Sequence, residues 1–391
     1  MQSTIVHITA DFPDCLAGAK TPAILNLVEA AKNFKHIVYS LNRVPGWGGV
    51  EALDFGPSRI AVAYAAPPCG VFLKSRMQRL ARWILSDIQA KGHAVDAIHA
   101  HKFTIEALCG SRVADDLGVP LICTIQANTD VKVLRARRDL RRVYEKIWNE
   151  AAHIISFSPR GEQEFTAEFG RRDNFDILPC ITDFGEPVSS DLVGNGRFVT
   201  VFNLNSYKLK NLGRTIRAVK ALSRERPGIS LDVFGGGSPS ALMEISKIVR
   251  KQQAERLVRL CGPIQHSNLQ ATLRGYVALV LPTLRETYGM VFAEAILSGI
   301  PILQSKGWGM HGLFDDDAIG YACDPRSEAD IERGLGYLVA NESRLKQSIS
   351  EMQSSGRLNC IQAPWIAKKY SEILQAVTNS SSEVMLRMSK Q

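Results

Sequence analysis

The feature that most limits the fold is a repeated alternation of short apolar runs with longer amphipathic segments. In the first half of the chain, apolar runs that we expect to be strands lie at 4–9, 37–41, 60–65, 97–100, 120–125 and 153–157. Segments with helical apolar spacing lie between several of them, at 21–31, 103–117 and 139–152. Strands that alternate with helices in this way indicate right-handed βαβ units and a parallel sheet.

The same alternation starts again after a turn-rich segment at 183–196, with strands expected at 198–202, 230–234, 257–261, 278–281 and 301–304. A chain of 391 residues is longer than one core normally holds. We therefore predict an α/β protein with two doubly wound, Rossmann-like domains. Their expected bounds are 1–185 for the first domain, 186–196 for a linker, 197–365 for the second domain, and 366–391 for a final helix and tail.

Composition places the chain among soluble, intracellular proteins. No apolar run approaches the roughly 18 residues that a membrane span needs, and the amino terminus lacks the basic and apolar regions of a signal peptide. The eight cysteines form no Cys-x-x-Cys pair, so we interpret them as free thiols rather than zinc ligands or disulfides. We expect a cytoplasmic protein.

The net charge of +8 predicts anionic partners, and no nucleic-acid-binding motif accompanies it. Much of this charge is concentrated in a basic amphipathic helix expected at 71–85 and in a basic stretch at 132–146. In the first, Leu73, Met77, Leu80 and Ile84 share one face, and Lys74, Arg76, Arg79 and Arg82 share the other. Two interpretations stay open: solvated faces of ordinary helices, or a peripheral contact with the anionic inner face of the cell membrane.

The segment 278–303 carries the clearest functional signal. A buried strand is expected to end at Pro282, and a helix is expected from Met290 to Leu297. Glu286 then follows the carboxyl end of a strand, where open α/β sheets bind ligands. Free amides at the start of the helix suit a diphosphate, and Glu294, one turn further, suits a ribose diol. The alternative is that Glu286 is a loop charge and Glu294 a solvated helix residue, because two glutamates at this spacing are common on helix surfaces.

The full string supports the functional interpretation. It resembles the E-x(7)-E segment of retaining glycosyltransferases of family 4, with seven matching positions: Pro282, Glu286, Gly289, Glu294, Ala295, Gly299 and Pro301. This resemblance implies the GT-B fold, in which two Rossmann-like domains face a central cleft. It also implies a nucleoside-diphosphate sugar as co-substrate, and a last helix, here at 365–377, that returns to the first domain.

The resemblance also implies roles for individual residues. Glu286 would act at the donor sugar, Lys210 would neutralise the leaving diphosphate, and His101, in the Asp-x-x-His-x-His motif at 96–101, would face the pocket. For His99 and His101 the alternative is one histidine packed inward and one solvated. The residues expected to bind the donor are Glu294, Thr287, Tyr288, Gly289, Met290, Val291, Gly18, Gly235 and Asn205.

Three positions depart from the family pattern. Ala17 replaces one glycine of a Gly-Gly loop, so the loop at Gly18 could equally be a plain turn. Gln126 stands where relatives often have histidine, which leaves only a binding role there. Asn205, or Asn203 if the loop is longer, takes the position of the family arginine, and Lys208 could supply the missing positive charge.

We predict a retaining glycosyltransferase that uses a glycan acceptor, lipid-linked in surface polysaccharide synthesis. No metal is expected, because basic residues and helix dipoles carry the diphosphate in this family, and Asp315–Asp317 is interpreted as a polar turn. Two alternatives stay open: a non-catalytic nucleotide-sugar-binding scaffold of a polysaccharide assembly complex, and a nucleotide-sugar epimerase.

Overall fold

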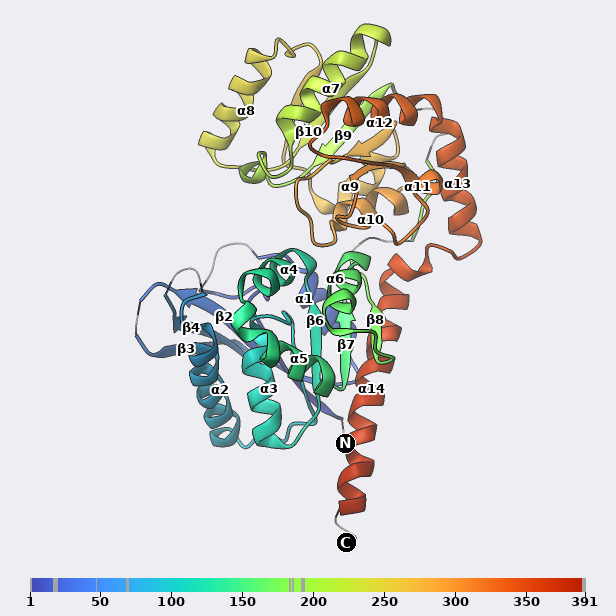
Figure 1. Ribbon diagram of the computed structural model, residues 1–391. Helices are drawn as coiled ribbons and strands as arrows, with labels where there is room; N and C mark the ends of the chain where they lie inside the picture. The colour runs from blue at the N-terminus through green and yellow to red at the C-terminus, as the bar shows by residue number, and fades with distance from the viewer. Residues whose placement is uncertain are drawn as a thin grey trace. The chain divides into compact units, whose positions relative to one another are not determined.

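The computed structural model describes residues 2–16, 20–46, 48–67, 70–182, 184, 186–190 and 194–388. The chain forms two compact units (Figure 1). The first comprises residues 1–181 and 363–391, and the second comprises 182–362. These junctions lie a few residues from the domain bounds expected from the sequence, and the segment expected as a linker is grouped with the second unit.

The first unit contains an eight-stranded sheet with the order β3-β4-β2-β1-β5-β6-β7-β8. All neighbours pair in parallel except β3 and β4. The strands are β1 (Thr4–Thr9), β2 (Lys35–Val44), β3 (Val50–Gly56), β4 (Arg59–Ala65), β5 (Ala97–Ala100), β6 (Leu121–Ile125), β7 (His153–Ser156) and β8 (Phe175–Ile177).

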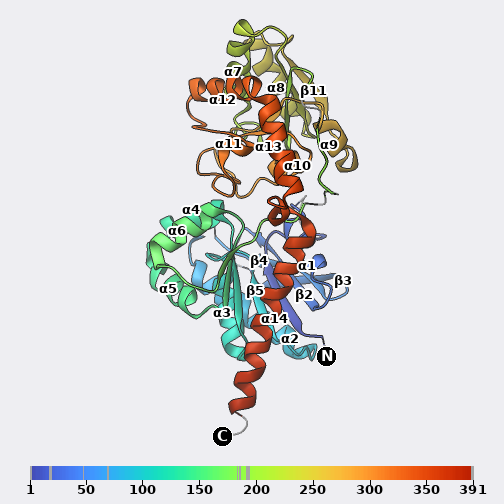
Figure 2. The same ribbon diagram turned by 90° about the vertical axis from the view of Figure 1, so that its right-hand side faces the viewer.

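Helices cover both faces of this sheet, as parallel sheets require. One face packs against α2 (Leu73–Ala90), α3 (Glu106–Leu117), α5 (Arg141–Glu150) and α6 (Pro159–Phe169), and α4 (Ala127–Ala136) packs on α6. The other face packs against α1 (Ala23–Ala30) and the long α14 (Ala363–Met388), which lie side by side (Figure 2). The final helix therefore belongs to the first unit, as the resemblance implied.

The second unit contains a six-stranded parallel sheet with the order β11-β10-β9-β12-β13-β14. Its strands are β9 (Arg197–Val201), β10 (Ser230–Phe234), β11 (Val258–Gly262), β12 (Ala278–Val280), β13 (Ile302–Ser305) and β14 (Gly320–Cys323). Its helices are α7 (Leu212–Glu225), α8 (Pro239–Lys251), α9 (His266–Leu273), α10 (Met290–Leu297), α11 (Asp316–Ile319), α12 (Glu328–Ala340) and α13 (Glu342–Ser354).

The predicted α/β class with two Rossmann-like domains is confirmed. In the second unit, numbering the strands in chain order gives 3-2-1-4-5-6, the order of the Rossmann fold. The first sheet has the same arrangement around β1 and β5, with β3 added at one edge. In the part of the chain that the structure describes, no helix is long and apolar enough to cross a membrane.

Candidate functional site

The second unit places Lys210 and Glu286 at the point where the strand order reverses. Strands β9 and β12 are neighbours there, and the chain leaves them in opposite directions across the sheet. The loop after β9 carries Lys210, and the loop after β12 carries Glu286. A crevice at the carboxyl ends of two such strands is the usual ligand site of this fold.

Lys210 and Glu286 are in direct contact. The Lys210 Nζ atom lies 2.5 Å from Glu286 Oε2, and both side chains are largely shielded from solvent. The second carboxylate oxygen of Glu286 accepts a hydrogen bond from the Thr287 amide at 3.2 Å. The structure therefore brings together the predicted diphosphate cation and the predicted sugar-facing acid, 76 residues apart in sequence.

A buried asparagine joins the two loops. Asn211 precedes α7 with a φ of 61°, and its Nδ2 atom donates to the carbonyls of Pro282 at 3.0 Å and Pro325 at 2.7 Å. The Leu209 carbonyl accepts from the Leu284 amide at 2.9 Å and from the Thr283 hydroxyl at 3.1 Å. These contacts fix the position of Lys210 relative to Glu286. Sequence reasoning had assigned Asn211 no such role.

The helix α10 begins as expected, directly after the glutamate loop. Gly289 precedes it with a φ of 77°, and a Cβ atom there would lie 2.6 Å from the Phe292 ring. Glycine is therefore required both by the backbone conformation and by space. The first amides of an α-helix have no partner within the helix, so those of Met290 and Val291 are suited to an anion.

Glu294 lies one turn inside α10 and is buried, with 7% of its surface exposed. Its Oε1 atom lies 3.3 Å from Nε2 of His266, the first residue of α9, and the Phe184 ring packs edge-on against the same imidazole. His266 follows the loop after β11. It is a neighbour of Glu294 that sequence reasoning missed.

A pocket of about 450 Å³ lies at the carboxyl ends of β9, β10 and β11. Gly235 and Asn205 line it, together with Pro263 and Ile264 from the loop after β11. Gly235 has a φ of 149°, and a Cβ atom there would collide with the Phe202 carbonyl. Asn205 Oδ1 accepts from the amide of Ser238, the N-cap residue of α8, at 2.9 Å.

In the first unit, His101 follows β5 at the corresponding reversal of strand order. Its ring is fully buried, stacks on His99 with 3.9 Å between ring centroids, and places Nε2 3.0 Å from His7 Nδ1. The His101 carbonyl accepts from Gln126 Nε2 at 2.9 Å. Gln126 therefore contributes a structural hydrogen bond. Gly18, predicted to bind the donor, lies outside the described residues.

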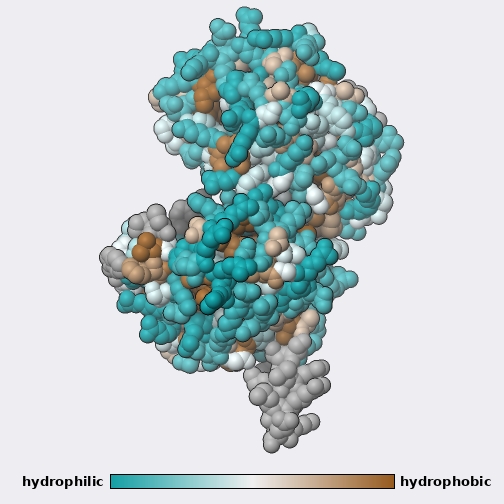
Figure 3. Space-filling view, in the orientation of Figure 1, coloured by the Kyte–Doolittle hydropathy of each residue, from teal (hydrophilic) through white to brown (hydrophobic). Residues whose placement is uncertain are grey.

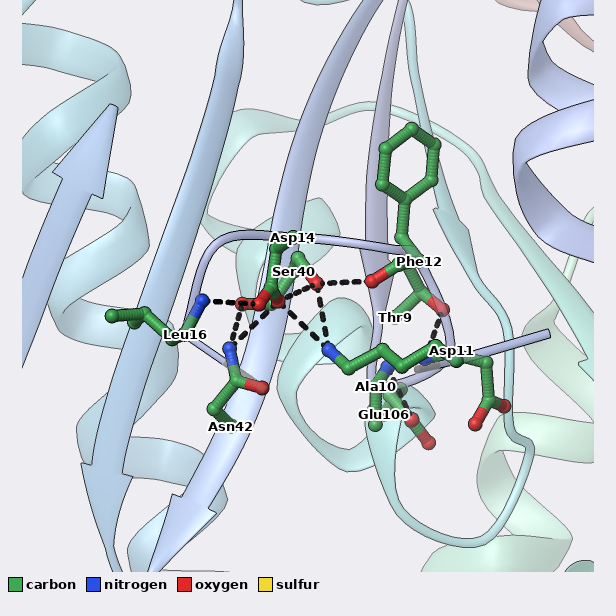
Figure 4. A network of polar contacts seen from close by, with 10 residues as sticks. Thr9, Ala10, Asp11, Phe12, Asp14, Leu16, Ser40, Asn42 and Glu106 are labelled. Carbon is green, nitrogen blue, oxygen red and sulfur yellow. Dashed lines mark hydrogen bonds and ion pairs between the residues drawn. The ribbon is translucent and has the colours of Figure 1, made fainter. Parts of the chain in front are cut away.

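The loop after β1 is held by a polar network that sequence reasoning did not find (Figure 4). The Asp14 carboxylate accepts from Lys20 Nζ at 2.8 Å, Ser40 Oγ at 2.5 Å, Asn42 Nδ2 at 2.8 Å and the Leu16 amide at 2.8 Å. Burial alone would raise the pKa of Asp14, but these donors hold it well below its ordinary range. The carboxylate is therefore a fixed negative anchor for this loop.

A second buried group lies between the ends of β1 and β5. Lys102 Nζ lies 2.6 Å from Asp11 Oδ2 and 3.7 Å from Glu106 Oε1, and that Glu106 oxygen also accepts from the Ala10 amide at 3.0 Å. Burial raises the pKa of Glu106 to about 7, more than the Lys102 charge lowers it. No motif marks these residues. Their only signal in the sequence was their place directly after the strands expected at 4–9 and 97–100.

Two protein-family models match this chain. A family model for glycosyl transferases group 1 matches residues 192–354, and one for a glycosyl transferase 4-like domain matches residues 36–180. A D-inositol 3-phosphate glycosyltransferase of Pseudarthrobacter chlorophenolicus is 26% identical over 255 residues, covering 60% of each chain. Matches to two further such relatives also span only 60–62% of their length.

Solved structures support the fold. Sucrose-phosphate synthase from Thermosynechococcus elongatus aligns with a TM-score of 0.72 at 17% identity, covering 97% of this chain and all of that one. HepE from Anabaena, solved with UDP-glucose, aligns with a TM-score of 0.67 at 14% identity over 95% of this chain and 99% of that one. The two family models together span most of both units. The chain therefore belongs to the glycosyltransferases of family 4 and has their GT-B fold.

Proposed function

We propose that the protein transfers a sugar from a nucleoside-diphosphate sugar to a hydroxyl group of a glycan acceptor, with retention of the anomeric configuration. The observation that carries this proposal is the contact between Lys210 and Glu286 at the reversal of strand order, beside the start of α10. The HepE structure, which contains UDP-glucose, supports a nucleotide-sugar donor.

The charges of the site suit this reaction. In the bound state Lys210 and the first amides of α10 stabilise the negative charge that develops on the departing diphosphate. Glu286 faces the donor sugar, where positive charge develops at the anomeric carbon, and Glu294 binds the ribose hydroxyls. Front-side attack fits this arrangement, with the acceptor hydroxyl proton passing to the departing phosphate oxygen. No metal is needed in this proposal, because the cation and the helix dipole carry the diphosphate charge.

The proposed acceptor is a lipid-linked glycan of a surface polysaccharide, reached at the inner face of the cell membrane. A groove between α2, α3 and α5 supports an anionic contact, because Lys74, Arg112, Arg142 and Lys146 line it with one acid, Asp115. The surface over these helices is predominantly hydrophilic (Figure 3), which fits electrostatic contact rather than insertion. Co-sedimentation should occur with vesicles that contain phosphatidylserine, and not with purely zwitterionic vesicles.

The direct test is calorimetric titration against UDP-, GDP- and ADP-sugars, followed by product analysis with and without a glycan acceptor. Transfer should require the acceptor, and Glu286→Ala should lower the rate by on the order of a hundredfold or more. Interconversion of the donor without an acceptor would instead show an epimerase.

One observation favours a second candidate, a nucleotide-sugar-binding scaffold without catalytic activity. Asn205 stands at the position of the family arginine, and its side chain already bonds the Ser238 amide. A scaffold would bind the donor but transfer nothing, and Glu286→Ala would leave cellular glycan output unchanged in a strain lacking the native gene.

A further inference from the structure

Three histidines from neighbouring segments form a continuous hydrogen-bonded chain inside the first unit. His36 Nε2 lies 2.8 Å from the Ala31 carbonyl oxygen, and His36 Nδ1 lies 2.8 Å from His7 Nε2. His7 Nδ1 lies 3.0 Å from His101 Nε2. These hydrogen bonds lead from the end of α1, through β2 and β1, to the segment after β5, and so end at the carboxyl edge of the sheet.

The acceptor at one end fixes the proton positions along the whole chain. A carbonyl oxygen only accepts, so His36 must carry its proton on Nε2, and its Nδ1 is then an acceptor. His7 must therefore donate from Nε2, and its Nδ1 accepts from His101 Nε2. The remaining nitrogen, His101 Nδ1, is then left with a lone pair and no proton.

That nitrogen has no hydrogen-bond partner among the residues that the structure describes, although it is buried. An unpaired buried acceptor is costly, so a group that supplies a hydrogen-bond donor is expected to occupy this place. The nearest charged group in sequence is Lys102, which is engaged with Asp11 at 2.6 Å.

The surroundings keep the three histidines neutral. Burial lowers the pKa of His7 and of His101 well below the ordinary value, and neighbouring histidines lower both further. The titratable groups facing these three imidazoles from other positions are His99 on β5, which packs against His7 and His101, and Lys102, whose positive charge lowers the pKa of His101 further. None of them places a carboxylate against the imidazoles.

A metal site is the competing explanation. Within the described part of the chain, His7, His99 and His101 form a group whose ligand atoms lie within 4.8 Å of one another. However, His99 uses both ring nitrogens, with the Tyr370 hydroxyl at 2.8 Å and the Thr124 hydroxyl at 2.8 Å. His99 and His101 are also stacked, which does not direct their nitrogens to one point.

We propose that His36 and His7 are positioning residues that hold His101 in the tautomer protonated on Nε2, so that Nδ1 accepts a hydrogen bond from a sugar hydroxyl. The ligand class rests on the proposed function, whereas the protonation of each ring nitrogen rests on the hydrogen bonds among the three histidines. His36 acts from the far end of the chain, through His7, without touching the ligand.

The test is nitrogen-15 NMR of histidine-labelled protein, which distinguishes protonated from unprotonated ring nitrogens. In the wild type at pH 7, His101 should be protonated on Nε2 only. His36→Ala removes the acceptor for His7 and should produce a measurable population of His101 protonated on Nδ1. His36→Gln keeps both an acceptor for His7 and a donor for Ala31, so it should restore the wild-type pattern. His93→Ala, outside the chain, is the matched control.

A His101 protonated on Nδ1 in the wild type, or a pattern unaffected by His36→Ala in a folded protein, would overturn the proposal. So would stoichiometric zinc bound through His7 and His101. In the transferase assay, His36→Ala should lower kcat roughly five- to tenfold with little change in KM for the donor, and His36→Gln should restore it. Because the NMR pattern needs no turnover, an inactive wild type with the expected tautomers would refute the proposed function alone.

Discussion

Because Lys210 and Glu286 are in contact, we expect substitutions of the two residues to change the affinity for a nucleoside diphosphate in opposite directions. Lys210 must exchange the Glu286 carboxylate for the diphosphate, so the ion pair at 2.5 Å competes with binding. Lys210→Ala removes the cation itself. Glu286→Gln removes only the competitor and leaves Lys210 available to the ligand.

The two magnitudes differ enough to be separated. A hydrogen bond to a charged group contributes about 1.5–3 kcal/mol, so Lys210→Ala should weaken UDP binding roughly 10- to 150-fold. The competing pair is partly shielded, with 18% and 15% of its side chains exposed. Even solvent-exposed pairs contribute about 0.2–1 kcal/mol, so for this shielded pair Glu286→Gln should tighten UDP binding by at least roughly 1.4- to fivefold.

Isothermal titration calorimetry with UDP at two salt concentrations measures both effects, and added salt should reduce them. The control is Lys247→Ala, which removes one positive charge from the exposed face of α8. Wild-type affinity in Lys210→Ala, or weaker UDP binding in Glu286→Gln than in the wild type, would refute this account of the site.

Three further predictions concern other parts of the two units. If Glu294 binds the ribose, the wild type should prefer UDP to 2′-deoxy-UDP, and Glu294→Ala should abolish that preference, as measured by calorimetry; an unchanged preference would contradict the role. Asn211→Ala should destabilise the second unit by roughly 2–4 kcal/mol in urea unfolding, because two buried carbonyls lose their donor; Asn211→Gly, which relieves the positive φ, should be less damaging. The pKa of Glu106 is raised to about 7 from an ordinary 4.5, so the folded state binds the proton more tightly than the unfolded state, and stability from this group is lost as pH rises from 4.5 to 7. The stability of Glu106→Gln relative to the wild type should therefore rise between pH 4.5 and 8, by on the order of 3 kcal/mol at most. The measurement is urea unfolding of both proteins across this range. A difference in free energy of unfolding that does not change with pH would contradict the prediction.

The elements that sequence patterns predicted are those whose burial is uniform. Strands such as β1 and β10 lie inside a parallel sheet and appear as apolar runs, so their bounds agree with the expected ranges. The edge strand β3 was missed because most of its residues are exposed and no apolar alternation marks it. The helix α4 was missed because its sequence is largely polar and only a few residues are buried.

The same distinction applies to the candidate site. The order of residues in one continuous segment placed Glu286, Gly289 and Glu294 around the start of a helix, because a helix fixes its own geometry. The ion pair with Lys210 needed the additional knowledge that β9 and β12 are neighbours. That neighbourhood follows from the doubly wound order, but the distance does not, since it depends on the hydrogen bonds of Asn211.

Buried polar groups in the first unit were beyond sequence reasoning for a further reason. His7 and His36 lie outside any motif, and a single buried histidine in a strand is usually a packed residue. Their meaning arises only from the parallel register, which sets His7 beside His99 on β5 and Ile5 beside His36 on β2. A shift of one residue in either pairing would turn an imidazole to the opposite face and break the chain. The motif at 96–101 marks His101, but the register of three strands determines which of its nitrogens can accept a hydrogen bond.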